Sequence, residues 1–221
     1  MLRRRVSLIL IGVLALVGLM VAVFSPPPEP SHGGRKLSEW LDFAPRPYIP
    51  SNPDVIQATK AIHNMGTNAV PWLVKWIRYE PPAWKVTAYQ LIGRVVKKSP
   101  ADLLRDDRQT LRGTACVFGF SAVGSEAKTA ISDLGQIMND PKRGQSAINA
   151  ALTLRALGTE AIPTFLSGAT SKNRVVRFIV SDHCRVLRYD TDPEVSRAAK
   201  EVLRVLDPQA LRTTGVVHES H

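Results

Sequence analysis

The sequence predicts an all-α protein in which one N-terminal transmembrane helix precedes a tether and an array of helix hairpins. Three observations lead to this fold class: an uncharged apolar run near the N-terminus, a proline-rich stretch behind it, and helical spacing with a recurring turn motif after that. The chain has 221 residues, 44% of them hydrophobic, with a net charge of +10. This much apolar material is enough for a sizeable core, which excludes a wholly disordered chain.

The first element is the apolar run. Residues 6–24 carry no charge and, at a helical rise of about 1.5 Å per residue, span roughly 28 Å, close to the hydrocarbon thickness of a bilayer. Three arginines at 3–5 precede the run, so we expect the N-terminus in the cytoplasm and the rest exported. Residues 1–24 are therefore predicted to be a single-pass anchor in the cell membrane. A cleaved signal peptide and a secreted protein remain the alternative, although signal peptides normally have a shorter apolar region ending in small residues.

The second element is the proline-rich stretch at 25–53, which holds eight of the sixteen prolines. Such a stretch favours extended polyproline conformation and predicts a semi-rigid tether. Between its two proline clusters, Ser38 is followed by Trp40 and Leu41. A capping serine with two apolar residues predicts about one helical turn, which would dock on the following domain.

The third element, the domain at 54–210, has helical spacing throughout. After Pro81 and Pro82, apolar residues recur at i, i+4, i+7, i+8 and i+11 from Trp84, which predicts one amphipathic helix, ended by the residues at 98–100. Near the C-terminus, a helix at about 174–187 is expected to pair with one at 193–206, the second capped by Asp192. The polar residues 211–221 predict a disordered tail.

Three copies of a turn motif align without gaps in this domain. Each has two apolar residues three apart, then glycine, a hydroxyl residue, Asn or Glu, and Ala. The glycine is predicted to end one helix in the left-handed conformation, and the hydroxyl residue to cap the next helix. Proline, or Thr129 in the middle copy, then falls in the first turn of the second helix, where its missing amide proton costs little. The residues concerned are Gly66, Thr67 and Pro71; Gly124 and Ser125; and Gly158, Thr159 and Pro163.

The spacing of the turn glycines gives the repeat length. Gly124 and Gly158 are 34 residues apart, which is one helix–turn–helix unit. Gly66 and Gly124 are 58 residues apart, too many for one unit and too few for two. We expect the helix that begins at Trp84 to fill this interval as part of a degenerate unit.

These copies, together with Pro71, Pro163 and the pair Val176-Arg177, resemble the HEAT-repeat family of armadillo-type proteins over about residues 54–210. The segment at 34–41 is also similar to the one that precedes the repeats in some membrane-anchored bacterial members. The resemblance implies a right-handed α-solenoid. It also implies a scaffold role in protein binding, since members are mostly scaffolds with unrelated partners.

No motif for catalysis, a cofactor or a metal is found. Asp182, His183 and Cys184 supply ligand types, but successive helical residues point about 100° apart and do not converge on one ion. Cys116 and Cys184 lack the spacing of a zinc module, and we interpret both as small buried hydrophobes; a bridge between them would need an oxidising compartment. The sequence therefore predicts no cofactor, no metal and no enzyme activity. An enzyme of the lyase or glycosylase type on a HEAT-like array remains an alternative by analogy alone.

The candidate partner-binding residues are aromatic and basic. Trp72 and Trp76 stand at i and i+4 and form one ridge, either an exposed protein-binding hot spot or packing between the first repeat and the helix from Trp84. Nine Lys and Arg residues lie between 75 and 112, and the candidates among them are Lys75, Arg78, Arg94, Lys97 and Lys98.

These basic residues would either line one concave face or belong to a solvated outer face. The leading hypothesis is a membrane-anchored, non-catalytic scaffold for protein–protein interaction. A binder of an anionic partner or nucleic acid is the second reading, and export argues against nucleic acid as its ligand.

Overall fold

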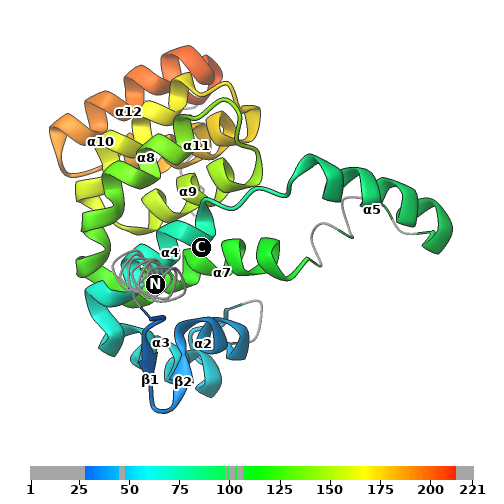
Figure 1. Ribbon diagram of the computed structural model, residues 1–221. Coiled ribbons are helices and arrows are strands. Elements are labelled where there is room, and N and C mark those ends of the chain that lie inside the picture. The colour runs from blue at the N-terminus through cyan, green and yellow to red at the C-terminus, as the bar shows by residue number, and fades with distance from the viewer. Residues whose placement is uncertain (1–27, 45–47, 98, 100–102, 104–106, 213–221) are drawn as a thin grey trace, which may run out of the picture.

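A computed structural model describes residues 28–44, 48–97, 99, 103 and 107–212. It is almost entirely helical, and the predicted all-α class is confirmed except for two short antiparallel strands, β1 (Ser31–His32) and β2 (Arg35–Lys36) (Figure 1). The predicted anchor at 1–24 lies outside the described residues, as does the tail from 213. Within the described ranges, no helix is both long enough and apolar enough to cross a bilayer.

Helix hairpins form the body of the molecule. In the part of the chain that the structure describes, four such pairs follow one another: α3 (Pro53–Met65) with α4 (Val70–Ile77), α7 (Arg108–Val123) with α8 (Ile131–Asn139), α9 (Gln145–Ala156) with α10 (Ile162–Leu166), and α11 (Arg174–Leu187) with α12 (Pro193–Leu206). The first helices pack side by side in the order α3, α7, α9, α11, while α8, α10 and α12 form a second row (Figure 1). Each hairpin therefore covers its neighbours along the stack.

The core is built from the apolar pairs of the turn motif. Ile62, Phe120 and Leu154 from the first helices are fully or almost fully buried, and so are Leu73 and Phe165 from the second helices. Burial of such large apolar side chains is the main favourable term that holds the hairpins together.

The turns between paired helices differ from the predicted cap. Gly66, Gly124 and Gly158 have positive φ, as expected, at 55°, 75° and 84°. Their ψ values, −138°, −136° and −160°, lie outside the left-handed helical region, in a conformation that is essentially restricted to glycine. The prediction of positive φ is confirmed, and that of a left-handed helical cap is wrong.

The predicted side-chain caps Thr67, Ser125 and Thr159 are also wrong. Short 3₁₀ turns connect the paired helices instead: η1 (Gly66–Ala69), η2 (Gly124–Ala130) and η3 (Thr159–Ala161), none with a side-chain cap. Their i→i+3 backbone bonds occupy amide groups that a cap would otherwise satisfy. Pro71 and Pro163 lie in the first turns of α4 and α10, as predicted.

The last hairpin agrees most closely with the sequence. α11 and α12 have the predicted bounds, and the Asp192 carboxylate accepts a hydrogen bond from the amide of Glu194 at 2.9 Å. Asn173 caps α11 in the same way, after the 3₁₀ turn η4 (Ser167–Thr170). The turn η5 (Pro208–Leu211) follows α12, so folded structure reaches the first residue of the predicted tail.

The predicted tether is wrong over part of its length. Strands β1 and β2 and helix α2 (Leu37–Phe43) are folded, and α2 packs against α3 and α7. Leu37, Trp40 and Leu41 are buried there, and the Trp40 indole donates a hydrogen bond to the His32 carbonyl oxygen at 3.0 Å. The expectation that this short helix docks is confirmed. Three large apolar side chains gain enough by burial to outweigh the extended preference of the flanking prolines.

Helix α5 (Ala83–Val96) begins after Pro81 and Pro82 as predicted, but it does not join the stack. It projects from the body (Figure 1), and its predicted inward side chains are exposed: Trp84 by 70%, Leu91 by 59% and Val95 by 82%. The prediction that this helix is part of a degenerate repeat is therefore wrong; the helix that packs on α4 is α7. The 58-residue glycine spacing is thus one hairpin repeat plus an insertion that includes α5.

Candidate interaction surfaces on helices α4 and α5

Helix α4 presents a row of aromatic and basic side chains beside its buried face. Leu73 and Ile77 point into the core, whereas Lys75 and Arg78 are exposed. Trp72 and Trp76 are half-buried, with ring centroids 5.7 Å apart. We call the five residues Trp72, Lys75, Trp76, Arg78 and Tyr79 the α4 surface.

Cations cover the two tryptophan rings. The Lys75 Nζ lies 4.6 Å from the centre of the Trp72 ring, and the Arg112 guanidinium carbon lies 5.1 Å from that of Trp76. These distances are typical of cation–π contacts. The tryptophans pack on the core of the body and not on the projecting α5, so the predicted packing against that helix is wrong. Each ring is thus partly in contact with the core and partly exposed.

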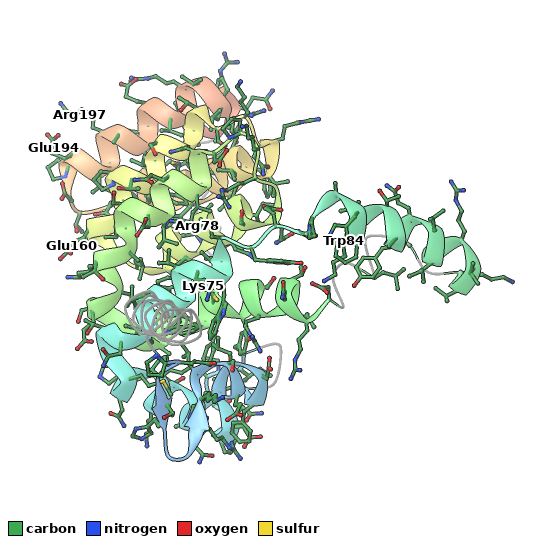
Figure 2. The ribbon with its side chains drawn as sticks, viewed as in Figure 1. Lys75, Arg78, Trp84, Glu160, Glu194 and Arg197 are labelled. Carbon is green, nitrogen blue, oxygen red and sulfur yellow. The ribbon has the colours of Figure 1, made fainter. Side chains whose placement is uncertain are left out.

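A groove of about 810 Å³ runs along α4 beside α8. Val70 and Val74 contribute apolar floor, and the Arg78 guanidinium pairs with the Asp133 carboxylate at 3.1 Å. Figure 2 shows Lys75 and Arg78 along this part of the body. The complete lining is Val70, Pro71, Val74, Lys75, Arg78, Tyr79, Thr129, Ala130, Asp133 and Arg143.

Ion pairs offset much of the positive charge predicted for this region. The pairs are Arg78–Asp133, Lys85–Asp107, Arg112–Asp42 and Arg143–Asp140. Among the described residues, Lys75, Arg94 and Lys97 have no carboxylate within ion-pair distance. The unpaired cations that the structure describes in this stretch are thus divided between α4 and α5.

The structure brings together only some of the predicted binding residues. Trp72, Lys75, Trp76 and Arg78 share the α4 surface, whereas Arg94 and Lys97 belong to the projecting α5. Lys98 lies outside the described residues. The basic cluster read from the sequence is therefore divided between two surfaces.

A polar cluster fixes the base of α5. Asp107 accepts hydrogen bonds from the Thr110 amide at 3.2 Å, which caps α7, and from the Tyr89 hydroxyl at 3.3 Å, and its carboxylate pairs with the Lys85 ammonium at 2.5 Å. Burial opposes ionisation of Asp107, but the hydrogen bonds from Lys85 and Thr110 hold its pKa below the ordinary value. The hydrogen bond to Asp107 likewise raises the pKa of Lys85. We call Lys85, Tyr89 and Asp107 the α5 base cluster.

The other flank of α5 is attached through Glu80. Its carboxylate accepts hydrogen bonds from the amides of Gly144 and Ser146, at 2.8 and 2.9 Å, and from the Ser146 hydroxyl at 2.6 Å. A carboxylate at the N-terminus of α9 is favoured by the free amide groups and the helix dipole there. Both flanks of the insertion are thus joined to helix N-termini of the body.

The residues considered for metal or thiol chemistry are dispersed or enclosed. Within the described ranges, no three His, Cys, Asp or Glu side chains are grouped to hold a metal ion. His183 packs edge-on against Phe165, and its burial lowers its pKa. Cys116 and Cys184 are buried free thiols, which confirms their interpretation as small hydrophobes; burial raises the pKa of Cys184 to about 11 and that of Cys116 further.

Several residues of these surfaces were not predicted from the sequence. Tyr79, Asp133 and Arg143 line the groove from three separate segments, so no local pattern connects them. Asp107 had a detectable signal in the sequence, since aspartate is a preferred N-cap residue. Comparison of the chain with protein-family models, curated proteins and solved structures finds no match.

Proposed function

We propose that this chain is a membrane-anchored, non-catalytic scaffold, a right-handed α-solenoid of HEAT-like repeats that binds a protein partner along α4. The observation that carries the proposal is the groove between α4 and α8. Its floor is apolar, its borders are charged, and the aromatic side chain of Tyr79 is part of its lining. This combination is typical of protein interfaces, where an apolar centre is surrounded by a polar rim.

The charges at the groove indicate the chemistry of the partner. Lys75 is exposed and has no carboxylate partner among the described residues, so it is available to an acidic side chain of the bound protein. The Arg78–Asp133 pair offers one charge of each sign, with Arg78 at the end of α4 and Asp133 on α8. We therefore expect an extended protein segment with apolar residues and at least one carboxylate.

Anchoring is the second part of the proposal and is supported by the uncharged run at 6–24 and the arginines before it. The folded segment that begins near Glu29 adds to this support. The Glu29 carboxylate accepts a hydrogen bond from the Ser38 amide at 2.5 Å, so the chain is already attached to the body five residues after Phe24. Five extended residues span at most about 17 Å. The body would thus be held near the bilayer.

Site-specific photo-crosslinking of the full chain in its own cells tests the protein-binding proposal. A crosslinker at Thr129, which is exposed in the groove, should capture a protein, whereas one at Arg197 on α12 should not. The variant K75E should abolish the product, while K200E, a charge reversal at an exposed lysine of α12, should leave it intact. A product that is insensitive to K75E, equal at both positions or digested by nuclease would contradict the proposal.

A further inference from the structure

Helix α5 carries an apolar face that nothing in the described structure covers. Trp84, Leu91, Ile92 and Val95 lie on one side of the helix and are 45–82% exposed. We call these four residues the α5 face. Soluble proteins rarely leave such a contiguous stripe open unless something else covers it.

The charge on α5 has a single sign. Residues 81–101 contain Lys85, Arg94, Lys97 and Lys98 and no acidic residue. Lys85 is occupied by Asp107, whereas Arg94 and Lys97 have no carboxylate partner in the part of the chain that the structure describes. At 100° per residue, Arg94 lies about 80° around the helix from Trp84. Lys97 is the C-cap residue of α5 and has φ of 53°, so it marks the end of the helix. The helix is therefore amphipathic, with Arg94 beside the apolar face and Lys97 at the end of the helix.

The α5 base cluster and Glu80 hold the helix away from the body. The side of α5 that carries Lys85 and Tyr89 is bound to Asp107, so the α5 face is directed elsewhere. Figure 2 shows Trp84 at the end of α5 nearest the body, with the rest of the helix extending beyond it. Because α5 is attached to the body at one end and its apolar face is exposed along its length, that face is accessible to an extended surface.

We propose that α5 lies in the surface of an anionic lipid bilayer, with the α5 face at the boundary between headgroups and acyl chains and with Arg94 and Lys97 on lipid phosphates. A basic amphipathic helix with tryptophan on its apolar side is typical of interfacial binding. A bilayer presents an apolar layer and an anionic layer side by side, which matches both features of α5 at once. The inference rests on the membrane anchoring in the proposed function, which would hold the body at a lipid surface.

The experiment uses the full chain in vesicles of phosphatidylcholine with phosphatidylglycerol. An environment-sensitive fluorophore is attached at Val95→Cys on the α5 face or, as the matched control, at Gln90→Cys on the polar side of the same helix. Cys116 and Cys184 are buried, so the introduced thiol is the reactive one. The label at position 95 should shift to the blue and be quenched by spin-labelled lipid, and the label at position 90 should do neither.

The second test changes the charge of the helix or of the lipid and measures how much α5 is bound to vesicles. The double variant R94Q/K97Q should lower the ratio of lipid-bound to free α5 by about thirtyfold, since each basic residue near an anionic surface contributes about a factor of five. Vesicles of phosphatidylcholine alone should weaken the signal similarly. Equal exposure of positions 90 and 95 in anionic vesicles would overturn the proposal. So would a blue shift without lipid that grows with protein concentration, because it would identify a second copy of the chain as the occupant.

Failure of anchoring is measured separately. Flotation of the full chain with vesicles in high salt reports on residues 6–24, because salt weakens the contacts of α5 but not a membrane-spanning helix. If the chain does not float, vesicles are added to the soluble protein and the same two labels are compared. The shift at position 95 then still decides whether α5 binds lipid.

Discussion

Helices α4 and α5 are neighbours in the sequence, each with tryptophan and an apolar stripe, yet they meet opposite surroundings. The apolar side of α4 is buried against α7, and Leu73 and Ile77 are fully enclosed. The corresponding side of α5 is open, with Val95 exposed by 82%. Helical spacing thus determines which face is apolar, whereas the helices that pack on it, near or far along the chain, determine whether that face is covered.

The largest effect expected from this comparison is in the stacked hairpins. Phe120 is fully enclosed on α7, so F120A should lower the free energy of unfolding by about 3–5 kcal/mol. Urea titration of the full chain in detergent, followed by circular dichroism, measures this loss. The control F178A removes the same ring from an exposed position on α11 and should change stability by less than about 0.5 kcal/mol. Equal losses would show that α11 is covered in solution.

The sequence predicted the stacked region well because its signals are local. Glycine, proline and apolar pairs recur at fixed distances, so the hairpins at Gly66, Gly124 and Gly158 and the helix capped by Asp192 were found. The folded segment at α2 was underestimated, because the prolines on both sides concealed three apolar residues that become buried when α2 packs on α3 and α7.

Substitution of a glycine in the turns between paired helices should have the next largest effect on the free energy of unfolding. Gly124 has φ of 75°, and nothing lies within 4 Å of where a Cβ atom would be. G124A therefore isolates backbone strain from crowding and should cost about 1–3 kcal/mol in the same urea titration. The neighbouring exposed change S121A should cost less than about 0.5 kcal/mol. No difference between the two would mean that the turn relaxes without penalty.

Asp107, where the inserted segment rejoins the stack, is expected to have an intermediate effect. D107A removes both the cap of α7 and the partner of Lys85, and should cost about 1–2 kcal/mol in unfolding free energy. D107N keeps a side chain that caps helices well and removes only the charge. Trypsin should cleave after Arg94 faster in D107A than in the parent chain, because α5 loses its attachment. Unchanged cleavage would show that Glu80 alone holds the helix.

The same residue predicts a pH dependence. The pKa of Asp107 is lower in the folded chain than its ordinary value near about 3.9, so its ionised form stabilises the fold. This contribution is complete above the ordinary pKa and is lost as the pH falls through the folded pKa. The stability difference between the parent chain and D107N should therefore be present at about pH 6 and shrink toward about pH 3. A difference that is constant with pH would assign the effect of D107N to packing.

The binding surfaces were only partly predicted, for a reason that the comparison makes plain. Trp72, Lys75, Trp76 and Arg78 share one short helix, so their spacing alone placed them together. Arg94 and Lys97 were grouped with them because they are close in sequence, but the insertion carries them away from the body (Figure 1). A cluster of charges in the sequence shows only that the residues are close along the chain. Because α5 projects from the body, its basic residues are separated in space from those of α4.

The smallest expected effect decides whether the comparison holds. Val95 and Val74 are the same residue type on the two helices, one exposed and one buried. V74S should cost about 1–3 kcal/mol, because it places a hydroxyl in the core and removes apolar contacts. V95S should change stability by less than about 0.5 kcal/mol in detergent-free solution or in uncharged detergent, because no side chain of the protein loses a contact. If V95S lowered the free energy of unfolding in urea titration as much as V74S does, α5 would have to pack on the body. That result would contradict both the projecting position of α5 and its binding to lipid.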